Sequence, residues 1–299
     1  MIKEEILALK LERHATILAH NYQIPAVQDV ADLVGDSLEL SRAAARLDSE
    51  VIIFCGVDFM AETAAILSPQ KRVVLPEKGA WCPMAHMITP EQLCDMKTCN
   101  PEAATVCYVN STAEVKAESD VCCTSANGVQ VVDSLGEKEV IFVPDRNLAA
   151  YVARHTDKKI IPWNGYCYVH DHFTADEVRS ARAEHPRAEV LVHPECRPEV
   201  IDQADFVYST AGMGRHARAS CAREFVIGTE VGMIYRLKKE NPEKEFYPLS
   251  QNAVCQNMKK TTLEKVLLAL QTLEPRVTVP ERIASRAKQS IERMLQVKV

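Results

Sequence analysis

The sequence lacks three features, and each absence excludes a class of protein. It has no run of about 18 apolar residues, so no transmembrane helix is expected. The segment 1–14 is charged and amphipathic and has no cleavable apolar core, so it is not a signal peptide. Basic residues do not predominate, since 35 Lys and Arg stand against 41 Asp and Glu. We therefore expect a cytoplasmic protein that binds neither membranes nor nucleic acid.

Close cysteine pairs of the metal-binding kind are also absent. No two of the eleven cysteines have the Cys-x-x-Cys spacing that is typical of zinc ribbons and thioredoxin-like sites. An odd number of cysteines in a chain of 299 residues also disfavours a small disulfide scaffold. The apolar fraction of 47% is that of a folded protein, and the length suits two or three domains. If cysteines bind a metal here, they come from distant parts of the chain.

Four short landmarks recur three times in the same order. They lie at residues 16–23, 105–112 and 189–196; at 31–37, 119–125 and 204–210; at 51–58, 140–146 and 225–231; and at 72–82, 159–167 and 245–255. Each contains a short apolar run rich in Val and Ile, which is typical of a buried parallel strand. Helical stretches such as 37–48 and 175–185 lie between them. The repeat predicts three homologous three-layer α/β units with parallel sheets around a pseudo-threefold axis.

Helix starts follow each repeat and help to set the unit boundaries. Thr89, Thr174 and Thr261 are each followed three residues later by Gln or Glu, which predicts a capping box. We also expect a helix at 3–12 and further helices in the C-terminal tail, which should pack on the first unit. The units are predicted to be 1–81 with 257–299, then 82–166, then 167–256.

Three cysteines occupy the same landmark, just after the last strand of each unit. Cys82, Cys167 and Cys255 are spaced 85 and 88 residues apart, whereas the other eight cysteines have no such counterparts. A pseudo-threefold axis would bring the three thiolates together, as a central iron–sulfur cluster requires. Three ligands for four irons leave one iron open as a Lewis acid. Zinc held by three cysteines and a water is the competing metal, and the spacing does not separate the two.

Polar side chains follow the first strand of each unit. His20, Asn21 and Tyr22 align with Val109, Asn110 and Ser111 in the second unit and with His193, Pro194 and Glu195 in the third. A one-residue slip adds Tyr108 to this layer, and His170 lies three residues beyond Cys167. The carboxyl ends of parallel strands are where α/β proteins place their sites. We therefore expect a central pocket with acid–base side chains.

The second landmark of each unit ends in hydroxyl side chains just before an expected helix. These side chains are Ser37, Thr124, Ser125, Ser209 and Thr210. Such residues cap helices, and helix N-termini also bind anions. Three N-termini around one axis favour phosphate or dicarboxylate substrates.

The motifs that carry these residues resemble those of the quinolinate synthase family, across essentially the whole chain. They are LAHNYQIP (18–25), VGDSLEL (34–40), GVDFMAE (56–62), CPMA (82–85), YVNST (108–112), CTSAN (123–127), PDRNL (144–148), GYCYVH (165–170), HPEC (193–196), GTEVGM (228–233) and CQNMKK (255–260). Two positions depart from the family pattern. Only Cys255 is present where some members carry a Cys-x-x-Cys redox switch, and Tyr168 stands where Pro is common.

The resemblance implies an activity: condensation of iminoaspartate with dihydroxyacetone phosphate to quinolinate, with loss of phosphate and two waters. It implies a [4Fe-4S] cluster with three Cys ligands, Cys82, Cys167 and Cys255, and one open iron. An enzyme that produces iminoaspartate would be the metabolic partner. By match to the family motifs, the catalytic residues are His20, Tyr22, His170, His193 and Glu195. The substrate-binding residues are His20, Ser37, Tyr108, Asn110, Ser125, His193, Glu195, Ser209 and Thr210.

Two other classes of protein fit part of the pattern. One is a non-catalytic iron–sulfur sensor on the same scaffold, although a sensor has no need of Tyr22, His193 and Glu195 at its centre. The other is a hydrolase with zinc held by three cysteines and a water.

Overall fold

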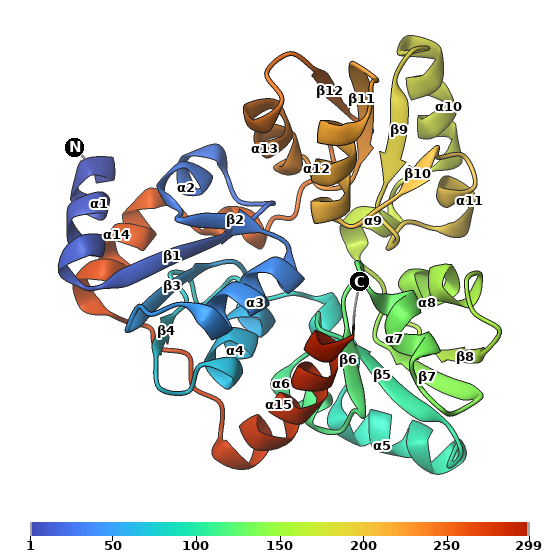
Figure 1. The fold of residues 1–299 in the computed structure, drawn as a ribbon, viewed down its shortest axis with the longest axis horizontal. Helices are drawn as coiled ribbons and strands as arrows, with labels where there is room; N and C mark the ends of the chain where they lie inside the picture. The colour runs from blue at the N-terminus through green and yellow to red at the C-terminus, as the bar shows by residue number, and fades with distance from the viewer. Residues whose placement is uncertain (1, 298–299) are drawn as a thin grey trace.

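The computed structural model describes residues 2–297, which form three separate parallel sheets (Figure 1). The first sheet contains β1 (Ala15–His20), β2 (Leu33–Gly35), β3 (Val51–Cys55) and β4 (Arg72–Val74). The second contains β5 (Ala104–Tyr108), β6 (Val121–Cys123), β7 (Glu139–Val143) and β8 (Lys159–Pro162). The third contains β9 (Glu189–Val192), β10 (Phe206–Val207), β11 (Glu224–Gly228) and β12 (Glu245–Pro248). Each strand overlaps one predicted landmark.

All three sheets have the same strand order. The orders are β2-β1-β3-β4, β6-β5-β7-β8 and β10-β9-β11-β12, and every pairing between these strands is parallel. Figure 1 shows the three units side by side around a common centre. The predicted fold class, three homologous α/β units, is confirmed.

Helices cover both faces of the first sheet because the side chains that its strands direct to each face are apolar. Ile17 and Ile53 pack with α1 (Ile2–Glu12), α2 (Pro25–Val30) and α14 (Leu263–Thr272). Leu18 and Ile52 pack on the other face with α3 (Ser37–Arg46) and α4 (Asp58–Leu67). Successive side chains of a strand point to opposite faces, so this alternation produces three layers.

The other two units repeat this arrangement. The helices of the second are α5 (Pro90–Cys99), α6 (Ala113–Ala117), α7 (Gly128–Asp133) and α8 (Arg146–Ala153). Those of the third are α9 (Tyr168–Asp171), α10 (Ala175–Glu184), α11 (Pro198–Ile201), α12 (Thr210–Ala219) and α13 (Met233–Glu240). In the third sheet, Val190 packs toward α10 and α11, and Leu191 packs toward α12 and α13. Short 3-10 turns, η1 (Met84–His86) and η2 (Met258–Lys260), follow Cys82 and Cys255.

Two of the three predicted capping boxes form as expected. Thr89 and Thr174 cap α5 and α10, and the side chain of Gln92 or Glu177 returns the hydrogen bond. The third prediction is wrong by one residue, because α14 begins at Leu263 and the Thr262 hydroxyl accepts from the Lys265 N–H. Thr261 is fully buried before the cap.

The C-terminal tail divides between two units. Helix α14 packs on α1 of the first unit, as expected, but α15 (Glu281–Gln296) packs mainly against α6 and the edge strand β6 of the second unit (Figure 1). Its Ile291 and Met294 are fully buried there, and Arg286 forms an ion pair with Glu118 at 2.7 Å. The expectation that the whole tail packs on the first unit is therefore wrong for α15. None of the helices in residues 2–297 is long and apolar enough to cross a membrane.

The strand registers align the ends of β1, β5 and β9. Ala19 pairs with Cys55, Cys107 with Val143, and Val192 with Gly228. His20, Tyr108 and His193 therefore occupy equivalent positions, one residue beyond these pairs. Tyr22, Asn110 and Glu195 follow two residues later. The one-residue slip that was predicted for Tyr108 is confirmed.

Candidate active site

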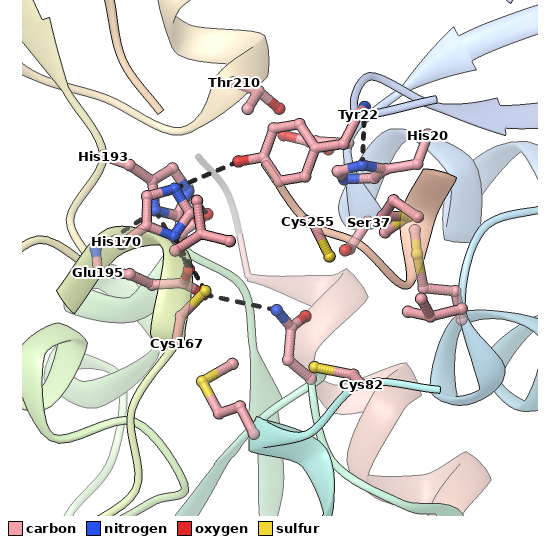
Figure 2. Close-up of a pocket in the computed structure, with 18 of the residues that line it drawn as sticks. His20, Tyr22, Ser37, Cys82, Cys167, His170, His193, Glu195, Thr210 and Cys255 are labelled. Carbon is pink, nitrogen blue, oxygen red and sulfur yellow. Dashed lines mark hydrogen bonds and ion pairs between the residues drawn. The ribbon is translucent and has the colours of Figure 1, made fainter. Parts of the chain in front are cut away.

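A pocket lies where the carboxyl ends of the three sheets meet, and its space free of protein atoms, which includes its opening to solvent, is about 710 Å³ (Figure 2). It brings together residues from all three units, including nearly every residue that the sequence predicted for the site. These are His20, Tyr22, Ser37, Cys82, Tyr108, Asn110, Ser125, Cys167, His170, His193, Glu195, Thr210 and Cys255. Ser209 lies outside this lining. Its hydroxyl caps α12 by accepting from the Gly212 N–H, and Ser209 faces a neighbouring cavity.

Two histidines at equivalent strand ends share the same hydrogen bond. The Nδ1 of His20 accepts the Tyr22 N–H at 3.2 Å, and the Nδ1 of His193 accepts the Glu195 N–H at 3.3 Å. A neutral imidazole whose Nδ1 accepts must carry its proton on Nε2. The Nε2 of His193 accordingly lies 3.2 Å from the Ser125 hydroxyl. Both rings therefore have the tautomer that donates from Nε2.

Burial keeps these two imidazoles neutral. Desolvation lowers the pKa of His20 to about 3 and that of His193 to about 3, although the charge of Glu195 opposes the shift in both. At neutral pH each ring is an uncharged donor, which suits it to bind an anionic group without a proton transfer.

The free energy of unfolding should fall as the pH falls from about 7 to about 5. The ordinary pKa of 6.5 applies in the unfolded chain, so that state takes up protons that folded His20 and His193 exclude. Their contribution is complete above pH 6.5 and is lost as the pH falls toward about 3. Each contributes a slope of up to about 1.4 kcal/mol per pH unit. Urea denaturation of metal-free protein measures this slope, and His193→Asn should reduce it; an unchanged slope in that variant would contradict the shift.

Glu195 is the centre of a buried hydrogen-bond network. Its Oε2 lies 2.6 Å from the Nδ1 of His170, and its Oε1 accepts from the Nδ2 of Asn110 at 3.5 Å. The Tyr108 phenol also hydrogen-bonds it. Burial raises the pKa of Glu195, but the interaction with the neighbouring imidazoles and the hydrogen bonds donated by His170 and Tyr108 outweigh burial, so the pKa of Glu195 is lowered. The side chain is therefore a carboxylate that can accept a proton.

A chain of hydrogen bonds connects Tyr22 to this carboxylate. The Tyr22 hydroxyl lies 2.6 Å from the Thr229 hydroxyl, which lies 2.8 Å from the Nε2 of His170. Burial raises the pKa of Tyr22, and the charge of Glu195 raises it further, so the phenol keeps its proton. The sequence prediction missed Thr229, although it lies in the GTEVGM motif. This series of hydrogen bonds offers a route for a proton between Tyr22 and Glu195.

The three pocket cysteines follow the last strands of the three different sheets, β4, β8 and β12, and face the same space (Figure 2). All three are free thiols and half-buried. Burial raises their pKa, and the thiols also affect one another: Cys82 and Cys255 both raise the pKa of Cys167. The ligand atoms of Cys167, His170 and Glu195 all lie within 4.8 Å of one another. These three side chains could therefore bind a metal ion, through one soft sulfur, one imidazole nitrogen and one carboxylate oxygen.

The parts of the pocket that could bind an anion are helix N-termini and not basic side chains. No Lys or Arg of the described chain lines the pocket, but the first residues of α3 and α12, Ser37 and Thr210, do. The N-cap of α3 is Asp36, one residue earlier than the expected serine, and α7 begins at Gly128, three residues after Ser125. Two helix dipoles therefore face the pocket, where three were expected.

Fold and site together define an α/β enzyme of three repeated units, with thiols and acid–base groups in one central pocket. Residues 4–296 match the family described as Quinolinate synthetase A protein. The chain belongs to this family. It is 60% identical over 295 residues to the quinolinate synthase of Methanoregula boonei, covering 99% of this chain and 98% of that one. It is 55% identical over 297 residues to that of Dehalococcoides mccartyi strain 195, with 99% and 98% covered. Quinolinate synthase 1 of Methanosarcina acetivorans is 55% identical over 296 residues, with 99% and 97% covered.

Proposed function

We propose that this protein condenses iminoaspartate with dihydroxyacetone phosphate to form quinolinate, a precursor for NAD biosynthesis, and releases phosphate and two waters. The observation that carries the proposal is the pocket itself. It joins three thiols that follow the last strands of the three sheets to Tyr22 and Glu195, which are linked by hydrogen bonds through Thr229 and His170. Family membership supports the same reaction.

We assign Cys82, Cys167 and Cys255 as the ligands of a [4Fe-4S] cluster. Their thiols are free, face one pocket and are close enough to influence one another's ionisation, so the donor set fits the cluster. When bound, a cluster with three cysteine ligands supplies an open iron that acts as a Lewis acid toward a hydroxyl or carboxylate.

The neutral imidazoles and hydroxyls of the pocket would bind the substrates' anionic groups. His20 and His193 donate from Nε2, and Ser37, Ser125 and Thr210 add hydroxyl groups near two helix N-termini. Tyr108 and Asn110 line the pocket from the second unit. The buried Oδ1 of Asn110 makes no hydrogen bond within residues 2–297. An acceptor left free in this way suits the imine N–H of the substrate. Ser209 would contribute to substrate binding indirectly, by capping the helix that begins with Thr210.

Tyr22 and Glu195 would move the protons. Glu195 is an ionised acceptor, and Tyr22 is a protonated donor whose burial disfavours the phenolate. His170 lies between them, 2.6 Å from Glu195 and bonded to Thr229 on its other nitrogen. Enolisation requires a base and dehydration requires an acid, so one connected pair can serve both steps.

An enzyme that produces iminoaspartate would be the metabolic partner. The substrate is an imine that water hydrolyses, and the pocket groups His193, Glu195 and Thr210 are all buried. A closed pocket excludes water from such a substrate once it is bound.

Anaerobic purification followed by an activity assay tests the proposal. We expect a brown protein with about four irons per chain. It should form quinolinate from dihydroxyacetone phosphate and freshly generated iminoaspartate. Colourless, zinc-loaded protein would rule out the cluster. A brown protein without quinolinate formation would instead support the sensor alternative.

A further inference from the structure

Each pocket cysteine follows the last strand of one sheet and donates its backbone N–H to a carboxylate that follows the third strand of the same sheet. The acceptor always lies two or three residues after the end of that third strand. The bonds are Cys82 to Asp58 at 3.0 Å, Cys167 to Asp145 at 3.1 Å, and Cys255 to Glu230 at 3.1 Å. The three acids also lie at the end of the third landmark of each repeat or one residue before it, in VIIFCGVD, VIFVPDR and FVIGTEV. The acid and the cysteine therefore recur together.

A second hydrogen bond joins the same two segments in every unit. The carbonyl two residues before each cysteine accepts a backbone N–H from the acid's loop. The bonds are Asp58 to Ala80 at 2.9 Å, Arg146 to Gly165 at 2.8 Å, and Val231 to Ala253 at 3.0 Å. The accepting residue is small each time, because the segments approach closely. A Cβ on Gly165 would lie 2.5 Å from the Pro144 carbonyl oxygen.

The carboxylate oxygen that does not accept from the cysteine has a second polar partner in each case. Asp145 is fully buried, and its Oδ1 accepts from the Leu148 N–H at 2.7 Å and so caps α8. The Oε2 of Glu230 accepts from the Gly232 N–H at 2.7 Å. The Oδ2 of Asp58 lies 2.7 Å from the Nε2 of His86. Asp145 and Glu230 each accept from two backbone N–H groups, and an amide has only one acceptor oxygen, so Asn or Gln could not serve both partners of either residue.

We propose that Asp58, Asp145 and Glu230 are positioning residues that hold the three cysteine loops in the geometry that binds the metal centre. The inference rests on the cluster assignment above. The carboxylates do not contact the metal; they fix the backbone from which each sulfur projects. Partners of this kind orient metal ligands, and their loss weakens metal binding by about 10- to 100-fold.

The chain supplies a matched control. Asp32, Asp120 and Asp205 also accept a backbone N–H of their own unit, near the amino ends of β1, β5 and β9. The Asp120 bond to the Thr105 N–H, at 2.7 Å, is of the same type as the Asp145 bond and lies in the same unit. It does not involve a cysteine. Asp120→Asn therefore makes the same substitution at a similar bond away from the pocket.

Iron release tests the proposal in full-length, anaerobically reconstituted protein. Asp145→Asn should release iron to a chelator about 10- to 100-fold faster than wild type, and the paramagnetic resonance spectrum of its reduced cluster should change. Asp120→Asn should match the wild type in both respects, even if it unfolds at a lower temperature. A purely structural role for Asp145 predicts a lower unfolding temperature with unchanged iron release.

A second variant keeps the test decisive if Asp145→Asn does not fold. Asp58 is partly exposed, so Asp58→Ala, which removes the acceptor of the Cys82 N–H, is the milder change, and faster iron release is again expected. Wild-type release rates in the folded variants would overturn the proposal. If wild-type protein holds zinc and no iron, the cluster assignment fails; the same comparison of zinc release would then still decide the role of the carboxylates.

Discussion

Replacing Cys167 with Ser should abolish cluster assembly and lower quinolinate formation by at least about 100-fold. Cys167 is the one pocket cysteine whose sulfur also lies beside an acid–base group, 3.2 Å from the Nδ1 of His170. The variant would leave only the two sulfurs that follow β4 and β12. Iron and sulfide content after anaerobic reconstitution, together with the visible absorption spectrum, measure the loss.

Cys221→Ser is the matched control for this experiment. Cys221 is exposed, lies in the third unit and has no counterpart at the shared landmark. This variant should keep wild-type iron content and activity. If Cys167→Ser retained its iron while Cys221→Ser lost it, the ligand assignment would be wrong.

Replacing Glu195 with Gln should lower kcat by about 10²- to 10⁴-fold while the cluster remains. The amide has nearly the same shape but cannot accept a proton. It also places an NH2 group against the donors that now surround the carboxylate, among them Asn110 and Tyr108. Steady-state kinetics with both substrates, alongside iron content, separate a catalytic defect from a loss of metal.

Glu177→Gln provides the comparison for Glu195. Glu177 belongs to the same unit, but it serves the capping box at the start of α10, and Gln fills that position in the box of α5. This variant should therefore keep its activity. A Glu195→Gln enzyme with wild-type kcat would remove Glu195 from the chemistry, and one that lost its iron would indicate a role in metal binding.

The repeat in the sequence predicted the fold because each unit buries its strands in the same way. Short Val- and Ile-rich runs such as 51–55 must be covered on both faces, so they form inner strands wherever they recur. The same reasoning from local sequence patterns did not predict where α15 packs. Its apolar stripe required a partner, but β6 and α6 lie more than 150 residues earlier, and no local pattern indicates which surface is left uncovered.

Candidate site residues could be predicted where a side chain sits at a repeated backbone position, as His20, Tyr108 and His193 do. Thr229 could not be predicted in this way, because its role depends on contact with Tyr22, 207 residues away. Asp58, Asp145 and Glu230 are different. The repeat does mark them, but a carboxylate near a thiol gains a function only when a hydrogen bond from the cysteine backbone is seen.

The equivalence of His20, Tyr108 and His193 shows how duplicated units can divide labour. One backbone frame presents an imidazole from the first unit, a phenol from the second and another imidazole from the third. Two residues further on, the same frame presents Tyr22, Asn110 and Glu195. A scaffold with three similar units thereby acquires a chemically asymmetric interior, so that different ends of a bound molecule would meet different side chains. Different side chains on one repeated backbone are enough to give the pocket a direction.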